Sequence, residues 1–511
     1  MRGNDVGHTG IDTDVVIAGA GPTGLMLACE LGLAGVDVVV VERLAEPTGE
    51  SRAGGMHSRT LEVLDQRGIL DRFLELGEPQ PVGHFSGLYL DFDESESRHP
   101  YPLMILQHVV ERLLEERAAE LGVRVRRSAG VSGLRQDEDG VTVELDTGEA
   151  EPATLRARYL VGCDGGRSTV RKLAGIDFPG TPATMTALIG DVELPDLDED
   201  YIWVRRVPDG DYSVIAFEPG WYRVITSEYD HVADRDEPAT FEQLRDSLIR
   251  LAGTDYGMRN PKWISRFGDA ARQAAQYRDG RVLLAGDAAH IHFPAGGQGL
   301  NMGVQDAVNL GWKLASVIRG QAPESLLDTY HDERHPVGER VLHNTRAQAA
   351  LNRPGVATDA LRDVFGSLIV FDDVNRLLRG MLTALDLRYP VEGGSHPLAG
   401  RRVPDADLKT SDGESYVYAL LHEGRPVLLD LRGSAEVAAA AEGWTDRVDL
   451  VEARSEDDHW PVPTVGEVPA PAALLIRPDG HVAWVAAADG TPDTAALRTA
   501  LTTWFGPAAQ G

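Results

Sequence analysis

Cysteine is scarce in this sequence, which contains only Cys29 and Cys163 among its 511 residues. A disulfide scaffold and a cysteine-rich metal site are therefore excluded, and both thiols are expected to be small apolar core residues. The sequence also lacks any run of about 18 apolar residues, so no transmembrane helix is predicted. Residues 1–13 are mostly polar and do not resemble a signal peptide, which predicts a cytoplasmic protein.

Basic residues are also few, because 49 Lys and Arg face 80 Asp and Glu and leave a net charge of −31. A polyanion is repelled by nucleic acid and by anionic lipid, so neither is expected as a partner. His290 and His292 have no further cluster of ligand residues near them in the sequence, so no metal is expected. Apolar residues at 42% and charged residues at 25% are typical of a globular protein, and the length predicts two to four domains.

The N-terminal part predicts a strand at Asp14–Gly19, a helix at Pro22–Gly35 and a second strand at Val36–Glu42. A βαβ unit of this length implies a parallel sheet and an α/β fold class. Further along, Leu61–Leu76 and Val109–Leu121 have the apolar spacing of helices, and Tyr159–Cys163 has that of a buried strand.

The first strand and helix of this unit enclose the motif Gly19-Ala20-Gly21-Pro22-Thr23-Gly24. Gly19 permits a tight turn, Gly21 lets a pyrophosphate approach the backbone, and Gly24 lets the helix pack on the strand. The helix N-terminus then supplies N–H groups to the phosphates. Glu42, at the end of the second strand, can accept hydrogen bonds from ribose hydroxyls, so the whole unit predicts a dinucleotide site.

Three further motifs follow predicted strands or open helices. Gly286-Asp287 ends the strand Arg281–Gly286, where an acid would face the ligand crevice, although a turn or helix-cap role is the alternative. In Asp164-Gly165-Gly166-Arg167-Ser168, the arginine could neutralise a phosphate or lie solvated in a turn. Pro294–Asn301 opens a helix with three glycines, which suits a flat ring that becomes anionic on reduction.

Three regions of the sequence differ in their hydrophobic pattern and predict three domains. Residues 12–180 together with 273–395 predict the nucleotide-binding domain with its long helices. Residues 181–272 alternate in a β-like manner and predict an inserted, mainly antiparallel sheet. Residues 398–511 predict a small α/β module.

Taken together, the Gly19–Gly24 motif, Cys163-Asp164-Gly165 and Gly286-Asp287 resemble the class A flavoprotein monooxygenases of the para-hydroxybenzoate hydroxylase fold. Gly49–Arg52, Val161–Arg171 and Ala285–Asn309 resemble the actinomycete aromatic-polyketide hydroxylases, which act on angucyclines and anthracyclines and to which rifampicin monooxygenases are related. The resemblance implies a Rossmann-like FAD-binding domain, an inserted β substrate domain and a C-terminal thioredoxin-like domain. That last domain lacks cysteine here, so its role would be structural.

The resemblance also implies the cofactors, which are non-covalent FAD and NADPH. Among the residues that would bind them, Asp164 would serve both FAD and NADPH, Glu42 the ribose, and Asp287 the ribityl chain and pyrophosphate. The complete set of cofactor candidates is Gly19, Gly21, Thr23, Gly24, Glu42, Arg43, Arg52, Gln107, Asp164, Asp287, Pro294, Gly297, Gly299, Leu300 and Asn301.

The implied reaction is hydroxylation of a polycyclic aromatic compound of polyketide type by dioxygen, through a flavin 4a-hydroperoxide, with no protein nucleophile. Candidate substrate-wall residues, which could equally be ordinary core or surface residues, are Tyr212, Phe217, Trp221, Arg223 and Phe293. Baeyer–Villiger oxygen insertion, rifamycin-type antibiotic inactivation and a non-catalytic flavin-binding role remain alternatives. The sequence identifies no general base, and a homodimer is left open.

Overall fold

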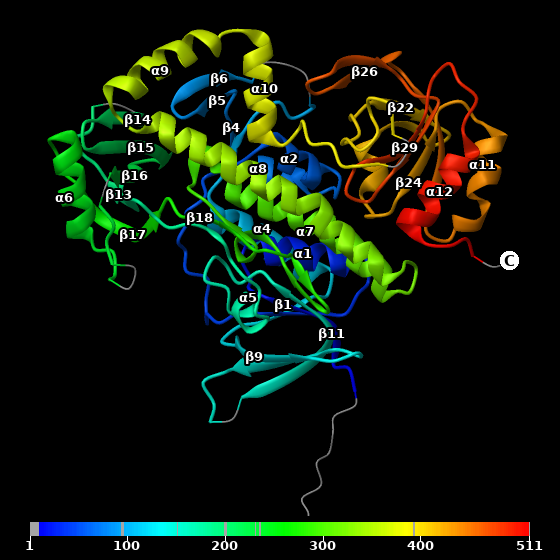
Figure 1. The fold of residues 1–511 in the computed structure, drawn as a ribbon, viewed down its shortest axis with the longest axis horizontal. Coiled ribbons are helices and arrows are strands. Elements are labelled where there is room, and N and C mark those ends of the chain that lie inside the picture. The colour runs from blue at the N-terminus through cyan, green and yellow to red at the C-terminus, as the bar shows by residue number, and fades with distance from the viewer. Residues whose placement is uncertain are drawn as a thin grey trace, which may run out of the picture.

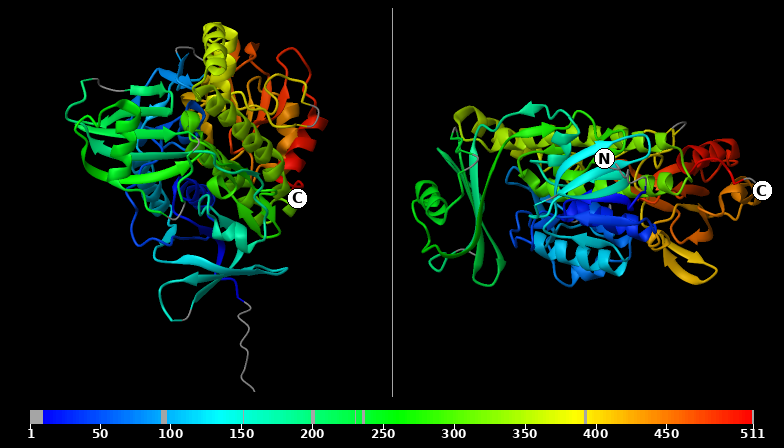
Figure 2. Two further views of the ribbon diagram at one scale, coloured as in Figure 1. Left: turned by 60° about the vertical axis from the view of Figure 1, so that its left-hand side comes forward. Right: turned by 90° about the horizontal axis from the view of Figure 1, so that it is seen from below.

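The computed structural model describes residues 10–92, 97–150, 152–198, 202–229, 231–234, 237–391 and 394–509. Three parts lie in a row, with a nucleotide-type sheet and long helices in the middle (Figure 1). The inserted sheet stands on one side of this centre and the C-terminal module on the other, as the view from below also shows (Figure 2).

The central sheet has five parallel strands in the order β20-β11-β1-β2-β8. Their bounds are β1 Thr13–Ala18, β2 Val38–Val41, β8 Arg124–Arg126, β11 Ala153–Gly162 and β20 Val282–Leu284. The antiparallel strands β9 (Gly130–Gln136) and β10 (Val141–Asp146) extend it, and β19 (Arg278–Asp279) forms an edge. Every residue of β2 is buried, as expected where helices cover both faces of a parallel sheet.

Helices cover this sheet. The first, α1 (Pro22–Leu33), lies between α4 (Gln107–Glu120) and α7 (Gln298–Ile318), and α8 (Asp328–Asn352) packs on α7. The helix predicted at Leu61–Leu76 is two helices, α2 (Ser58–Asp65) and α3 (Leu70–Leu74). They are separate because Gly68 adopts a φ of +63°, which ends the first of them.

The inserted sheet is antiparallel throughout, in the order β14-β15-β16-β13-β17. The bounds are β13 Thr186–Glu193, β14 Ile202–Val207, β15 Gly210–Glu218, β16 Trp221–Glu228 and β17 Arg259–Gly268. Helix α6 (Phe241–Ala252) covers its outer face, with Leu244 and Leu248 packed on Val214 and Val224. The inner face, which includes Phe217 and Arg223, is turned toward the central part.

The C-terminal module contains the mixed sheet β23-β22-β25-β24-β28-β29. Its bounds are β22 Asp407–Thr410, β23 Gly413–Tyr416, β24 Val427–Asp430, β25 Asp449–Ser455, β28 Ala473–Ile476 and β29 Val482–Ala486. A parallel β24-α11-β25 unit, with α11 at Ala435–Ala441, precedes an antiparallel hairpin and the final helix α12 (Thr494–Phe505). This order of elements is that of a thioredoxin-like fold.

Buried charges join this module to the central helices. Glu333 of α8 accepts hydrogen bonds from Arg477 of the module, at 2.9 Å, and from Lys313 of α7, at 2.7 Å. Burial alone would raise the pKa of Glu333, but the charges of Arg477 and Lys313 outweigh it and lower that pKa to about 2. Trp312 adds an apolar contact with Trp504 and Phe505. The two parts are therefore held together by ion pairs as well as by apolar packing.

The shorter elements complete the chain. They are β3 Gly55–Met56, β4 Glu78–Pro79, β5 Val82–Phe85, β6 Leu88–Asp91, β7 Leu103–Met104, α5 Thr169–Leu173, β12 Gly180–Thr181, β18 Ala271–Gln273, β21 His290–Ile291, α9 Val356–Leu368, α10 Asp372–Thr383, β26 His459–Val462 and β27 Gly466–Pro469. Within the described ranges, no helix combines the length and the apolar character needed to cross a bilayer.

Candidate functional site

The loop between β1 and α1 is shaped by its glycines. Gly19 has a φ of +105°, and a Cβ there would lie 2.4 Å from the Cys163 carbonyl oxygen. A Cβ on Gly24 would lie 2.0 Å from the carbonyl oxygen of Gly19, so neither position accepts a side chain. Gly21, in contrast, has no heavy atom within 4 Å of its Cβ position. The loop is thus tight toward the protein and open outward at the helix N-terminus, which fits a pyrophosphate.

Glu42 lies one residue beyond β2 and forms a hydrogen bond with the loop between β1 and α1. One carboxylate oxygen accepts a hydrogen bond from the N–H of Ala20 at 2.9 Å, and the other accepts one from the N–H of Leu44 at 2.9 Å. Each oxygen keeps a second lone pair for a ribose hydroxyl. Arg43 is exposed beside it.

Arg52 and Gln107 lie at the segment of residues 52–54, where the central part meets the inserted sheet. The Oε1 atom of Gln107 accepts from the N–H of Ala53 at 3.1 Å, and Nη2 of Arg52 donates to Ser265 of β17 at 2.9 Å. Gly54 lies so close to the ring of Phe217 that a Cβ would be 2.4 Å away. The two parts are therefore in direct contact at this segment.

Asp164 caps the short helix α5. Its carboxylate accepts hydrogen bonds from the N–H of Thr169 at 2.6 Å, from the N–H of Val170 at 3.1 Å and from the Ser168 hydroxyl. The contacts of Asp164 with FAD and NADPH remain a prediction, and these local bonds fix the orientation of its carboxylate.

Asp287 differs from Asp164 in having a free carboxylate. It follows β20 in a turn whose Gly286 has a φ of +61°, and its side chain is exposed. No hydrogen bond joins this carboxylate to any residue within the described ranges. Thr23 lies against the turn, since its Oγ1 atom is 2.5 Å from a Cβ position on Gly286. The strand end thus brings an unengaged acid next to the first glycine loop.

A second glycine loop, Gly296–Gly299, precedes α7. Gly296 and Gly297 have φ values of +68° and +65°, conformations that glycine adopts without strain. A Cβ on Gly297 would have only His57, at 3.7 Å, within 4 Å, and one on Gly299 would lie 4.0 Å from Asp287. No side chain therefore covers the loop surface beside Asp287, which fits a flat ring. Pro294 and Gly297 are exposed there, and Leu300 is half-buried.

Asn301 and His57 hold this loop in place. Asn301 accepts from the N–H of His57 at 2.7 Å and donates to the carbonyls of Gly297, at 2.9 Å, and Gly55, at 3.3 Å. The His57 Nε2 atom lies 2.7 Å from the Gly296 carbonyl. Burial lowers the pKa of His57, so the ring is neutral and this nitrogen donates. The sequence does not predict this role of His57, because nothing in Met56–Ser58 indicates a contact with a loop near residue 296.

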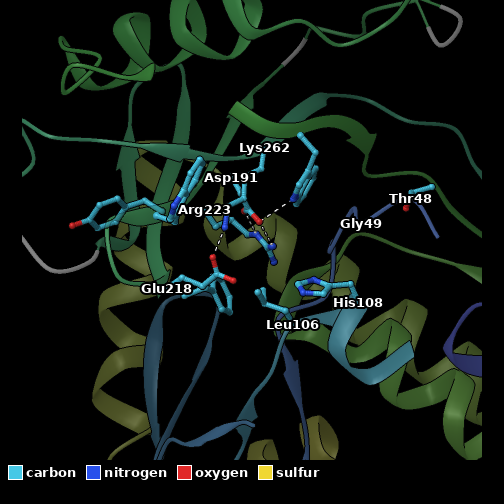
Figure 3. Close-up of a pocket in the computed structure, with 12 residues that line it drawn as sticks. Thr48, Gly49, Leu106, His108, Asp191, Glu218, Arg223 and Lys262 are labelled. Atoms are coloured by element: carbon cyan, nitrogen blue, oxygen red, sulfur yellow. Dashed lines mark hydrogen bonds and ion pairs between the residues drawn. The ribbon is translucent and has the colours of Figure 1, made fainter. Parts of the chain in front are cut away.

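A pocket of about 260 Å³ opens at the inner face of the inserted sheet (Figure 3). Its walls are Thr48, Gly49, Leu106, His108, Asp191, Phe217, Glu218, Trp221, Tyr222, Arg223, Lys262 and Trp263. Three predicted wall residues, Phe217, Trp221 and Arg223, are among them. The pocket therefore combines aromatic rings with charges of both signs.

Arg223 forms a buried ion pair at the base of this pocket. Its Nε and Nη2 atoms donate to the two oxygens of Asp191 at 2.9 and 3.0 Å, and the indole of Trp263 also donates to Asp191 at 2.9 Å. The guanidinium lies 4.6 Å from the centre of the Phe217 ring. Arg223 is 2% exposed, so its charge is already neutralised within the protein.

Tyr212 and Phe293 do not line the pocket. Tyr212 is packed on the α6 side of the sheet with Val214 and Leu244, and burial raises its pKa to about 12. This position favours the alternative interpretation of Tyr212 as an ordinary core residue. Phe293 packs against Phe267 of β17, with ring centres 5.9 Å apart, near the Gly296–Gly299 loop.

Metal-ligating side chains do not gather in the part of the chain that the structure describes, where no group of three or more His, Cys, Asp or Glu residues could hold an ion. The candidate site therefore consists of the two glycine loops, Asp287 and the aromatic pocket of the inserted sheet. A glycine loop for a dinucleotide pyrophosphate, a second glycine loop that can accept a flat ring, and an inserted antiparallel sheet are the arrangement of the FAD-dependent monooxygenases.

Comparison with known families gives the same answer. The chain belongs to the FAD binding domain family, which matches residues 12–345, and residues 396–508 match the aromatic-ring hydroxylase C-terminal family. The protein is thus an FAD-dependent monooxygenase with FAD as its cofactor, and NADPH is the usual reductant in this family.

Individual relatives cover nearly the whole chain. It is 49% identical over 508 residues to a 12-dehydrotetracycline 5-monooxygenase/anhydrotetracycline 6-monooxygenase of Streptomyces rimosus, covering 97% of this chain and 99% of that protein. It is 48% identical over 503 residues to a rifampicin monooxygenase of Streptomyces venezuelae, covering 98% and 100%. The solved structure of an anhydrotetracycline hydroxylase from Streptomyces rimosus superposes with a TM-score of 0.90 at 48% identity, covering 97% and 100%.

Proposed function

We propose that this monooxygenase hydroxylates a polycyclic aromatic substrate of polyketide type, with NADPH as the electron donor. The observation that carries the proposal is the Gly296–Gly299 loop, which is free of side chains, next to the carboxylate of Asp287 and to Phe293, which packs on Phe267 of the inserted sheet. The relatives named above, which act on tetracycline-type substrates and on rifampicin, support the substrate class.

The residues present fit FAD along one continuous path. The Gly19–Gly24 loop would take the pyrophosphate, Glu42 the ribose and Asp287 the ribityl chain, with Arg52 and Gln107 near the flavin phosphate and ribityl. The backbone of Leu300 and Asn301, at the positive end of α7, would meet the ring, because this end stabilises the negative charge of a reduced flavin. When bound, FAD supplies the activation of dioxygen, so the chain has to bind, orient and exclude water.

The substrate would lie between the Gly296–Gly299 loop and the inner face of the inserted sheet. The pocket of about 260 Å³ is small for such a compound, since ligand sites commonly measure about 300–1,000 Å³. It would therefore enclose one end of the ring system, against Phe217 and Trp221. Because Arg223 is paired with Asp191, its part would be to hold Phe217 in place and not to bind an anion.

The experiment is NADPH oxidation measured against a panel of tetracyclic aromatic polyketides, with the product mass recorded. The proposal predicts that one compound accelerates NADPH use and gains one oxygen atom on a ring carbon. Slow NADPH use with every tetracyclic compound and no oxygenated product would contradict it.

A second candidate, antibiotic inactivation of the rifamycin type, is favoured by the 48% identity to rifampicin monooxygenase. Rifampicin is therefore included in the panel, followed by a growth-inhibition assay of the product. Baeyer–Villiger insertion would be recognised by ring expansion to a lactone, which hydrolysis opens.

We also propose a division into three domains, which are residues 12–180 together with 273–395, residues 181–272, and residues 398–511.

We further propose a homodimer. Helix α9 supports the dimer, because its apolar residues Val356, Leu361 and Val364 are 91%, 59% and 59% exposed. Since the net charge of −31 opposes association, the dimer should weaken at low salt. Light scattering of Leu361→Arg against the unchanged protein tests this, and a monomeric unchanged protein at physiological salt would contradict it.

A further inference from the structure

Asp306, in the middle of α7, is an acid with no exposed surface. One of its oxygens accepts hydrogen bonds from the backbone N–H of Gly286, at 3.1 Å, and from Nε2 of His290, at 2.7 Å. The other accepts from Nε of Arg334 at 2.7 Å. Asp306 thus binds directly to the turn that carries Asp287, although it cannot itself reach a ligand.

Asp306 is held as an anion. Burial would raise its pKa, but the charge of Arg334 and the hydrogen bonds from His290 and Arg334 outweigh burial and lower it. A charged acceptor binds the Gly286 N–H more strongly than a neutral one would. The hydrogen bond therefore joins the Asp306 carboxylate to the Gly286–Asp287 turn.

Arg334 connects Asp306 to the C-terminal module. Arg334 is 1% exposed, and its Nη1 atom donates to the hydroxyl of Tyr389 at 2.9 Å. The ring of Tyr389 stacks on that of His481 in the module, with centres 4.3 Å apart. His481 in turn lies 3.5 Å from Asp479, which is paired with Arg477.

We propose that Asp306 is a positioning residue for FAD, and that the module of residues 398–511 sets its position through His481, Tyr389 and Arg334. The module then has a role in cofactor binding although it contributes no cysteine and none of the proposed FAD contacts. The inference rests on the proposed contact between Asp287 and FAD.

The test is Tyr389→Phe, which removes the hydroxyl that Arg334 binds and keeps the ring stacked on His481. Tyr418→Phe is the matched control, because Tyr418 is also buried, and its hydroxyl donates to the Val403 carbonyl at 3.1 Å and accepts from Arg402 at 3.4 Å, with no hydrogen bond to Arg334 or Asp306. Both variants lose one buried hydroxyl, so both should lower the melting temperature of the apoprotein. Asp287→Ala is measured alongside, to test the proposed contact itself.

FAD affinity, measured by fluorescence titration of apoprotein, separates the roles. We expect Tyr389→Phe to raise the FAD Kd about threefold to tenfold, a size typical of coupling through a packed network. Tyr418→Phe should leave it unchanged. Should Tyr389→Phe lose only thermal stability, as Tyr418→Phe does, the positioning role is refuted. In that event a raised Kd for Asp287→Ala would keep the proposed site intact, whereas an unchanged Kd would refute the site as well.

Discussion

Two aspartates at strand ends show how one residue type takes two roles in this protein. The carboxylate of Asp164 accepts hydrogen bonds at the N-terminus of α5, while that of Asp287 accepts no hydrogen bond from the described residues. The sequence predicts that both bind cofactor and leaves a turn or helix-cap role open for Asp287. The distinction depends on where the neighbouring N–H groups point, which the sequence does not reveal.

Replacing Asp287 with Ala should weaken FAD binding without unfolding the protein, because an exposed carboxylate contributes no packing. A hydrogen bond to a charged group contributes about 1.5–3 kcal/mol, so the Kd should rise by roughly one to two orders of magnitude. Fluorescence titration gives the affinity and circular dichroism the fold. Asp412→Ala, at an exposed turn of the C-terminal module, is the control, in which FAD affinity should be unchanged.

Arg223 should be sensitive even to a conservative substitution. Arg223→Lys keeps a positive charge but cannot form both hydrogen bonds to Asp191, and Arg223→Met leaves that acid buried and unpaired. Breaking a buried pair costs about 3–5 kcal/mol, so the methionine variant should unfold at much lower urea concentration than the unchanged protein. Urea unfolding of all three proteins tests this, and equal midpoints would show that the pair contributes nothing.

The partner of Arg223 was not predictable from its position in the sequence. Asp191 and Arg223 face each other only in the register that pairs β13 with β16, and that register is a property of the assembled sheet.

At the scale of the element, the Gly296–Gly299 loop can be tested by adding a side chain. Gly297→Val forces a branched residue into a φ of +65° and places methyl groups over the surface proposed for the flavin ring. Product formed per NADPH consumed should fall far more than FAD affinity, since affinity rests mainly on the pyrophosphate loop. The paired measurement is FAD titration and product analysis.

Gly148→Val serves as the matched control, because Gly148 also has a positive φ, +77°, and open space, but lies in an exposed turn after β10. Equal coupling of NADPH use to product in Gly297→Val and Gly148→Val would show that the Gly296–Gly299 loop is not the reactive site.

Among the elements, those with a strong local pattern were predicted and those defined by tertiary contact were not. The sequence predicts β1, α1 and β2 within a few residues of their observed ends, since an apolar run, a glycine motif and a terminal acid coincide there. Helix α6 is not predicted within the β-like region, although the sequence marks both of its ends. Thr240 and Gln243 form a capping box at its start, and Gly253 ends the helix. The short strands β3 and β7 have no pattern of their own, and they exist because they pair with each other.

At the scale of the whole molecule, several buried or half-buried histidines predict sensitivity to acid. Burial lowers the pKa of His57, His292 and His481, and it lowers that of His84 to about 4 from an ordinary value of 6.5. Below pH 6.5 the unfolded chain therefore binds protons that the folded chain does not. Stability should be complete above pH 6.5 and fall steadily toward pH 4, by about 3 kcal/mol from His84 alone.

Melting temperature measured from pH 8 to pH 4 tests this expectation. His84→Gln should flatten the acid side of the curve, whereas the same change at the exposed His343 should leave its slope as it was. A melting temperature that is constant down to pH 5 in the unchanged protein would contradict the argument.

The whole-molecule arrangement was also only partly open to prediction. The lack of cysteine in the C-terminal module predicted a structural role, but no pattern predicted that Arg477 would meet Glu333 or that Tyr389 would reach Arg334. Such pairings join residues far apart in the chain, and each depends on how already folded parts dock.

The pairing of the central sheet has a consequence for the timing of synthesis. In this sheet Thr13 faces Ala157 and Leu160 faces Val282. Two of the four strand pairs of the inserted sheet join consecutive strands, and its other two join strands closer along the chain, since Thr186 faces Glu228 and Gly268. As the chain leaves the ribosome, we expect the inserted sheet to close first, because contacts between near neighbours form sooner than distant ones. Strand β20, which brings Asp287, emerges only afterwards. The nascent protein would therefore acquire its flavin late, and a shortage of flavin during expression should accumulate chains whose last parallel strand has not yet been fixed.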